Sequence, residues 1–254
     1  MDDMNTRITR AESEASLALI QELFCPPWEF LLAGSYRRGS PTSLNANLIA
    51  LHPSHQNVTP PSYDGKVPER VGHNTVPFKR SSLSRVKDGI LATQVVPSLV
   101  ERGFISGTFT TGAYKWQGIA RIPTKNPDGV WETLFARKEA IAEGRGCFRS
   151  VDISLVPMKS RGAALLALTG DQDFTHIMQE KAAKRGLLLN EFGLWRLLPE
   201  GEKLKRNDVQ YGRWELVASE TEEEIFDELQ TPWVDPEKRN FSFLKTPSKK
   251  VATK

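Results

Sequence analysis

The feature that most constrains this chain is a short apolar strand that ends in a glycine and leads, through a polar turn, into a second strand. Residues 29–39, EFLLAGSYRRG, predict a buried strand that breaks at Gly34. Residues 45–51 then alternate, which places Asn45 and Asn47 together on one face of a strand. A glycine-serine turn, two arginines and an outgoing apolar strand are typical of a nucleotide-binding corner, although such a corner would carry carboxylates at positions 45 and 47.

A second alternating strand offers a third group for the same corner. Residues 148–157, FRSVDISLVP, place Asp152 on a polar face between two serines. Three carboxylates at positions 45, 47 and 152 would hold two hard divalent cations, one to lower the pKa of an attacking hydroxyl and one to neutralise the phosphates being transferred. The turn supplies three side chains that would bind a triphosphate through charge and hydrogen bonds, namely Ser35, Arg38 and Ser43.

The rest of the chain predicts further helices and a hairpin separated by polar loops. We expect a helix over 10–24, a proline- and serine-rich insertion or loop over 53–86, a helix kinked by proline over 84–103, a hairpin over 104–123 and a polar loop before residue 148. Residues 162–186 predict two helical stretches hinged at Thr169-Gly170, and TEEE at 221–224 is a capping box that opens a last helix. The sequence pattern changes near residue 160, from strands and loops to helical stretches, which indicates a boundary between two parts of the chain.

Composition narrows the classes of partner and site. The formal net charge is only +3, but residues 238–254 hold six basic residues and no acid, and they could contact phosphates or form a solubilising tail. Cys25 and Cys147 cannot make a metal cage, and the spacing of His52 and His55 does not suit two ligands on one helix face. Without a hydrophobic run near ~20 residues or a signal-peptide core, we expect a soluble, intracellular protein, nuclear in a eukaryote.

Five segments in order resemble one enzyme family. GSYRRG followed by x-Asn-x-Asn resembles the G-S-x-R-R-G … D-x-D signature of family X DNA polymerases. RSVDISLVP resembles the strand that carries that family's third catalytic aspartate, and ALLALTGDQDF resembles its passage from palm to thumb. LNEFGLWRL and TEEEIFDELQTPWVDPEKR resemble its thumb segments. The order of these matches, which extend along nearly the whole chain, makes the resemblance specific.

The resemblance implies a fold of the mixed α/β (α+β) class. A nucleotidyltransferase palm sheet with flanking helices would occupy residues 1–160, including the polar insertion at 53–86, and a small α/β thumb would occupy 161–242. Residues 243–254 would form a disordered basic tail. The implied activity is the addition of nucleotides to a primer 3′-hydroxyl by two Mg²⁺ or Mn²⁺ ions. The implied partners are a DNA primer-template or DNA ends together with dNTP, with rNTP as a further candidate, and the chain would act as a monomer.

The resemblance also implies roles by position. Ser35, Arg38 and Ser43 would bind the triphosphate, and positions 45, 47 and 152 would be metal ligands, with Asp152 also accepting the proton of the primer hydroxyl. The sugar and base pocket would be lined by Ala167, Leu168 and Gly170. The residues expected near nucleic acid are Lys115 and Ser150 at the primer and Thr175 and Gln179 at the nascent pair and template.

Several positions depart from the family pattern. The helix at 10–24 resembles the last helix before the palm, so we expect no lyase or helix-hairpin-helix region upstream of it and a weaker grip on duplex DNA. Ala167 stands where one form of the family has tyrosine, which predicts relaxed sugar selectivity unless the backbone itself excludes the 2′-hydroxyl. Ser150 and Gln179 stand where arginines are common, and Leu44 stands where glycine is usual.

Asn45 and Asn47 admit two interpretations. An amide keeps the shape of a carboxylate but removes its charge, so cation affinity should fall steeply and chemistry should nearly stop. The first interpretation is an active polymerase whose aspartates were exchanged for asparagine to trap substrates, and the second is a natural pseudoenzyme that binds nucleic acid or a partner. Two identical isosteric exchanges beside an intact Asp152 favour the first. A template-independent enzyme that tails DNA or RNA ends is a further alternative, and template dependence and pathway stay open.

Overall fold

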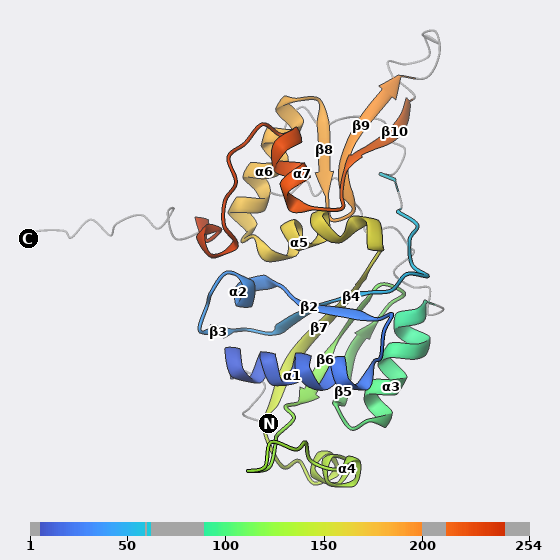
Figure 1. Ribbon diagram of the computed structural model, residues 1–254, viewed down its shortest axis with the longest axis vertical. Helices are drawn as coiled ribbons and strands as arrows, with labels where there is room; N and C mark the ends of the chain where they lie inside the picture. Colours follow the sequence, from blue (N-terminus) through green and yellow to red (C-terminus); the bar gives the residue numbers. More distant parts are fainter. Residues whose placement is uncertain (1–5, 59, 62–88, 200–211, 242–254) are drawn as a thin grey trace, which may run out of the picture.

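The structure is a computed structural model that describes residues 6–58, 60–61, 89–199 and 212–241 (Figure 1). Most of the insertion expected at 53–86 and the whole tail expected at 243–254 therefore lie outside the described residues. The described residues form a five-stranded mixed sheet, a three-stranded antiparallel sheet and a two-stranded ribbon, with helices packed against the two larger sheets. This confirms the predicted mixed α/β class. None of the helices in the described ranges is both long and apolar enough to cross a membrane.

The five-stranded sheet brings the two alternating strands together at its centre. Its order is β2 (Glu29–Leu32), β4 (Ala46–Leu51), β7 (Phe148–Val156), β6 (Lys115–Arg121) and β5 (Ile105–Thr111). β4 and β7 run parallel, and the other neighbours are antiparallel. The register pairs Asn47 with Asp152 across β4 and β7, and Gln117 with Asp152 across β6 and β7. Three polar side chains thus share one face of one rung of the sheet.

Two helical segments cover the opposite face of this sheet. They are α1 (Arg10–Leu23), opened by a capping box between Thr9 and Glu12, and a π-helical turn at Leu91–Val95 that continues as α3 (Val96–Glu101). Pro97 is the second residue of α3, which directly follows the π-helical turn, so the proline expected at a kink lies where the helix changes from π to α. The main core forms between these helices and the sheet, and its largest side chains include Ile20, Phe30, Leu48, Leu99, Phe104 and Trp116.

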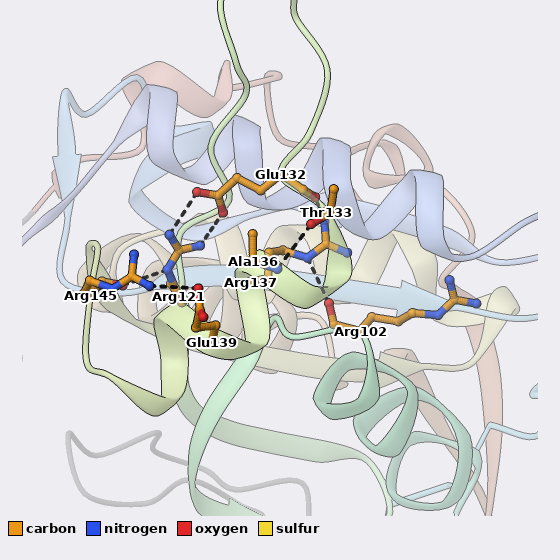
Figure 2. Close-up of polar contacts among 8 residues, drawn as sticks. All are labelled: Arg102, Arg121, Glu132, Thr133, Ala136, Arg137, Glu139 and Arg145. Atoms are coloured by element: carbon orange, nitrogen blue, oxygen red, sulfur yellow. Dashed lines mark hydrogen bonds and ion pairs between the residues drawn. The ribbon is translucent and has the colours of Figure 1, made fainter.

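The segment between β6 and β7 holds a helix that the sequence pattern predicted as polar loop. It is α4 (Leu134–Ala142), whose N-cap Thr133 accepts the Ala136 N–H. Figure 2 shows how buried arginines fix this segment: Arg121 makes a bidentate contact with Glu132 at 2.6 and 3.1 Å. Arg137 donates to the backbone oxygens of Arg102 and Glu132. Ion pairs and caps, rather than an apolar stripe, define the helix, which explains why periodicity missed it.

The second sheet, β8 (Leu187–Asn190), β9 (Gly193–Pro199) and β10 (Gly212–Ala218), packs with three helices. These are α5 (Arg161–Thr169), α6 (Gln172–Lys184) and α7 (Glu222–Glu228). The predicted break between α5 and α6 at Thr169-Gly170 and the predicted TEEE capping box are both confirmed. A separate core includes Phe174, Met178, Ala182 and Phe226. Figure 1 shows this unit above the five-stranded sheet, with α2 between them.

The remaining elements are short and surround the turn after β2. β1 (Ile8–Thr9) pairs with β3 (Thr42–Ser43), α2 is the single turn Gly34–Arg37, and 3₁₀ turns lie at Met158–Ser160 and Pro236–Lys238. Both cysteines are exposed and form no disulfide. The turn after β2 contacts the five-stranded sheet through β4 and the second unit through α5, and the candidate site is built from it.

Candidate functional site

The glycine that ends the first strand is required by its neighbours. Gly34 has a φ of +66°, a conformation that side chains other than glycine rarely adopt. A Cβ atom at this position would lie 2.5 Å from Nδ2 of Asn47. The Ala33 N–H also donates to the Asn47 carbonyl oxygen at 2.9 Å. The glycine-serine turn and the polar rung of the sheet are therefore in direct contact.

The two serines expected at a triphosphate lie together beside this turn. Oγ of Ser35 donates to Oγ of Ser43 at 2.7 Å, and Ser43 is only 4% exposed. The two hydroxyls are therefore hydrogen-bonded to each other in the structure. Leu44, at the position where the family pattern has glycine, is 72% exposed, so a large apolar side chain borders the serines.

Arg38, the third expected triphosphate ligand, bonds to the second unit of the fold. Its Nη1 donates to the Thr169 carbonyl oxygen at 2.7 Å and its Nε to Oδ1 of Asn240 at 2.7 Å. Burial lowers the pKa of the guanidinium from its ordinary value, and the charge of Asp171 opposes that shift. Arg38 thus reaches across the boundary between the two sheets instead of lying free at the turn.

The side chains at positions 45 and 47 bond to each other. Nδ2 of Asn45 donates to Oδ1 of Asn47 at 3.3 Å, and both residues are half-buried. Asn47 lies in register with Asp152 on the adjacent parallel strand. The predicted convergence of positions 45, 47 and 152 is therefore seen in the fold, but with two amides and one carboxylate. It lies where the central strand β4 begins beside β7, and we call this place the edge.

Asp152 is engaged by two side chains of β6. Nε2 of Gln117 donates to its Oδ2 at 2.9 Å, and Nζ of Lys115 lies 3.4 Å from the same oxygen. The Asp152 side chain is 14% exposed and that of Lys115 is 39% exposed. Lys115 and Gln117 lie two residues apart on β6 and therefore on one face of the strand, but nothing in the local sequence indicated that this strand would pair with β7. Sequence reasoning therefore missed Gln117.

These donors do not fit the two divalent cations that the family resemblance implies. Hard cations prefer several anionic oxygens, whereas this edge offers two neutral amides and one carboxylate that already accepts an ammonium and an amide N–H. Among the residues that the structure describes, no group of three or more His, Cys, Asp or Glu side chains could hold a metal ion.

The residues expected at the sugar, the base and the template lie around the α5–α6 junction. Ala167 is half-buried on α5, while Leu168 packs into a small cluster with Ile49 and Val156 of the sheet. Gly170 follows α5 directly, and a Cβ there would lie 2.4 Å from Cδ1 of Phe174. Arg38 donates a hydrogen bond to the carbonyl oxygen of Thr169, which lies between Leu168 and Gly170. The α5–α6 junction therefore lies next to the turn after β2.

The remaining residues predicted at nucleic acid are separated into two groups. Thr175 and Gln179 lie one turn apart on α6, both half-buried. Ser150 lies on the same face of β7 as Asp152, in register with Ile119 of β6. Lys115 lies on β6, and instead of projecting freely from the hairpin it forms the ion pair with Asp152. The primer group is thus on the first sheet and the template group on the second unit.

A buried ion-pair cluster joins the two units behind this site. Glu222 at the start of α7 is 4% exposed and accepts hydrogen bonds from Arg37 at 2.5 and 3.0 Å and from Arg239 at 2.5 Å. Arg37 also donates to Oγ1 of Thr169. Arg239 is fully buried, and burial lowers its pKa while the charge of Glu222 opposes the shift. Sequence reasoning used Arg38 of the arginine pair and left the role of Arg37 unrecognised.

Comparison with known proteins agrees with this geometry. The family model described as "DNA polymerase beta palm" matches residues 7–158, and the one described as "DNA polymerase beta thumb" matches residues 164–240. Similar relatives include DNA polymerase lambda of Arabidopsis thaliana and of Rattus norvegicus, each 25% identical, and DNA nucleotidylexotransferase of Eulemur macaco, 24% identical. Each alignment covers 94% of this chain but only 37%, 34% and 42% of the respective relative.

The palm match alone covers more than half of the chain, and the thumb match follows it in the expected order. The five-stranded sheet corresponds to the palm and the three-stranded sheet with α5–α7 to the thumb. This chain belongs to family X of the DNA polymerases, the family of DNA polymerase beta.

Proposed function

We propose that this chain binds a nucleoside triphosphate and a DNA 3′ end at the edge formed by β4 and β7, and that its form with aspartate at positions 45 and 47 transfers nucleotides to that end. The observation that carries the proposal is the contact between the glycine-serine turn and the rung that pairs Asn47 with Asp152. A phosphate-binding turn and a reactive carboxylate are needed within one nucleotide's reach of each other, and this contact supplies that proximity.

In this proposal each residue has a role that follows from its charge and its position. Ser35, Ser43 and Arg38 bind the triphosphate, and the half-buried Ala167 and Gly170 line its sugar and base. Asp152 is the acceptor for the proton of the primer hydroxyl. With aspartate at positions 45 and 47, three carboxylates would form the oxygen-rich set that Mg²⁺ or Mn²⁺ prefers. As the chain stands, the edge binds substrates without turning them over.

A second candidate is a non-catalytic module that binds nucleic acid. The observation that favours it is that these polar side chains already have partners within the chain. The amides of Asn45 and Asn47 bond to each other, and the Asp152 carboxylate is paired with Gln117 and Lys115 of β6. Such a module would hold DNA with no requirement for a nucleotide. The names of the relatives, DNA polymerase lambda and DNA nucleotidylexotransferase, favour the catalytic family role, with or without a template.

The test is a gain of function. The variant N45D/N47D should extend a 3′ end at saturating Mn²⁺ or Mg²⁺, whereas the parent chain should stay silent. The control N57D/N126D adds the same two charges at exposed positions and should also stay silent. Primer-template, single-stranded DNA and RNA ends, each with all eight nucleotides, separate polymerase from tailing activity. DNA binding by N45D/N47D without extension of any end would contradict the proposal and support the binding module.

The sugar pocket has its own test. Ala167 leaves less bulk at the α5–α6 junction than a tyrosine would, so N45D/N47D should accept rNTP and dNTP with comparable efficiency. The substitution Ala167→Tyr in that background should restore a preference for dNTP if side-chain bulk excludes the 2′-hydroxyl. A strong deoxy preference already present with alanine would assign the exclusion to the backbone.

A further inference from the structure

We infer that Gln117 is a third position that keeps this edge free of metal, in addition to Asn45 and Asn47. This inference rests on the proposed function, because it concerns the same carboxylate, Asp152. Both contacts from β6 fall on one oxygen, with Gln117 at 2.9 Å and Lys115 at 3.4 Å from Oδ2. Aspartate at positions 45 and 47 would therefore meet an Asp152 whose Oδ2 is already held from β6.

The sheet itself holds Gln117 in this position. The Cα of Gln117 is in register with that of Asp152 across the antiparallel β6–β7 pair. The backbone pairing of the two strands therefore places the Gln117 side-chain amide beside the carboxylate. On the other side, Oγ1 of Thr110 on β5 donates to Oε1 of Gln117 at 3.4 Å. That contact orients the amide so that its N–H₂ group faces Asp152. Hydrogen bonds thus connect Thr110 on β5 to Gln117 on β6, and Gln117 to the Asp152 carboxylate on β7.

Gln117 and Lys115 differ in how readily they would yield to a cation. The Lys115 side chain is 39% exposed and carries a flexible stem, so it can move into solvent, where ion pairs contribute little. Gln117 is half-buried between β5 and β7 and accepts a 3.4 Å hydrogen bond from Thr110, so it is less free than Lys115 to move into solvent. A hydrogen bond to a carboxylate must be broken before that lone pair can coordinate a metal. Gln117 is therefore the stronger of the two restraints.

The test measures metal binding directly. Free Mn²⁺ is followed by electron paramagnetic resonance during titration of N45D/N47D and N45D/N47D/Q117L. We expect the triple variant to bind Mn²⁺ at least tenfold more tightly. Adding Gln94→Leu, at an exposed glutamine of the π-helical turn, to N45D/N47D is the control and should leave the affinity at the level of N45D/N47D. Equal affinities for N45D/N47D and the Q117L triple variant would overturn the inference.

A fourth variant separates the hydrogen bond from the loss of side-chain volume. Thr110→Val in the N45D/N47D background leaves Gln117 in place but removes the donor that orients it, so Mn²⁺ affinity should rise by less than in the Q117L triple variant. If Leu at position 117 disturbs folding, judged by circular dichroism, Gln117→Met provides an unbranched side chain without donors.

Extension assays on the same proteins keep this inference distinct from the proposed function. Tight Mn²⁺ binding by the triple variant with no extension of any 3′ end would support the role of Gln117 and contradict the proposed function. Tight binding and full extension by N45D/N47D alone would support the proposed function and overturn the role of Gln117. A lower half-saturating Mn²⁺ concentration for extension in the triple variant is the result expected if both hold.

Discussion

The edge of the palm sheet and the joint between palm and thumb use charge in opposite ways. At the joint, one buried carboxylate, Glu222, binds two arginines: Arg239 is fully buried, and the Arg37 side chain is 25% exposed. At the edge, Asn45 and Asn47 are neutral, and the single carboxylate of Asp152 is paired from β6. The chain thus retains its charges where they hold the two units together and lacks them where they would bind cations.

This difference shows that the fold does not depend on the charges at the edge. A buried charge is costly unless it is paired, and at the joint Glu222 pairs with both arginines. Nη2 of Arg239 has no hydrogen-bond partner among the described residues, but its guanidinium lies among the aromatic rings of Phe174, Phe226 and Trp233. At the edge, amides form their own hydrogen bond and need no counter-charge. The palm and thumb of this chain therefore keep their arrangement with amides at positions 45 and 47.

The largest effect should come from removing the charge at the joint. Glu222→Gln leaves the Arg37 and Arg239 guanidinium groups without their counter-charge, and breaking a buried pair in this way costs about 3–5 kcal/mol. Urea unfolding followed by tryptophan fluorescence should show that loss. Glu223→Gln, one residue on and exposed, is the matched control and should change the free energy of unfolding by less than about 0.5 kcal/mol. Equal effects of the two variants would show that the joint is not a stabilising cluster.

Local sequence patterns predicted the pieces of both regions but not their pairing. Alternation predicted the polar faces of β4 and β7, and TEEE predicted the start of α7, because each depends on neighbouring residues alone. The contacts of Gln117 with Asp152 and of Arg37 with Glu222 join residues 35 and 185 positions apart. Such contacts depend on strand order and on the packing of palm against thumb, which no local periodicity encodes.

The ion pair beside α4 should give an intermediate effect that depends on pH. The hydrogen bonds from Arg121 hold the pKa of the Glu132 carboxyl below its ordinary value (Figure 2). A lowered carboxyl pKa stabilises the fold above the ordinary pKa, and this contribution is lost as the pH falls through the lowered value. Glu132→Gln should therefore cost about 1–3 kcal/mol at neutral pH, since Glu132 is three-quarters buried rather than fully buried.

The measurement is urea unfolding of parent and variant between neutral and acidic pH. The difference in free energy of unfolding between the two proteins should shrink steadily as the pH is lowered. Glu139→Gln, in an exposed pair with Arg145 on the same segment, is the control and should show little difference at any pH. A difference for Glu132→Gln that is independent of pH would show that shape, rather than charge, holds this segment.

The smallest effect should come from returning charge to the edge. In N45D/N47D three carboxylates would face one another across β4 and β7, and like charges opposite each other in a sheet destabilise it by up to about 1 kcal/mol. The melting temperature in EDTA should therefore fall slightly below that of the parent. Saturating Mn²⁺ should raise it again, because a ligand that binds only the folded state stabilises that state, whereas the parent should not respond. A parent chain that Mn²⁺ stabilises as strongly as the variant would place cation binding at the edge despite its amides, and the contrast between edge and joint would no longer hold.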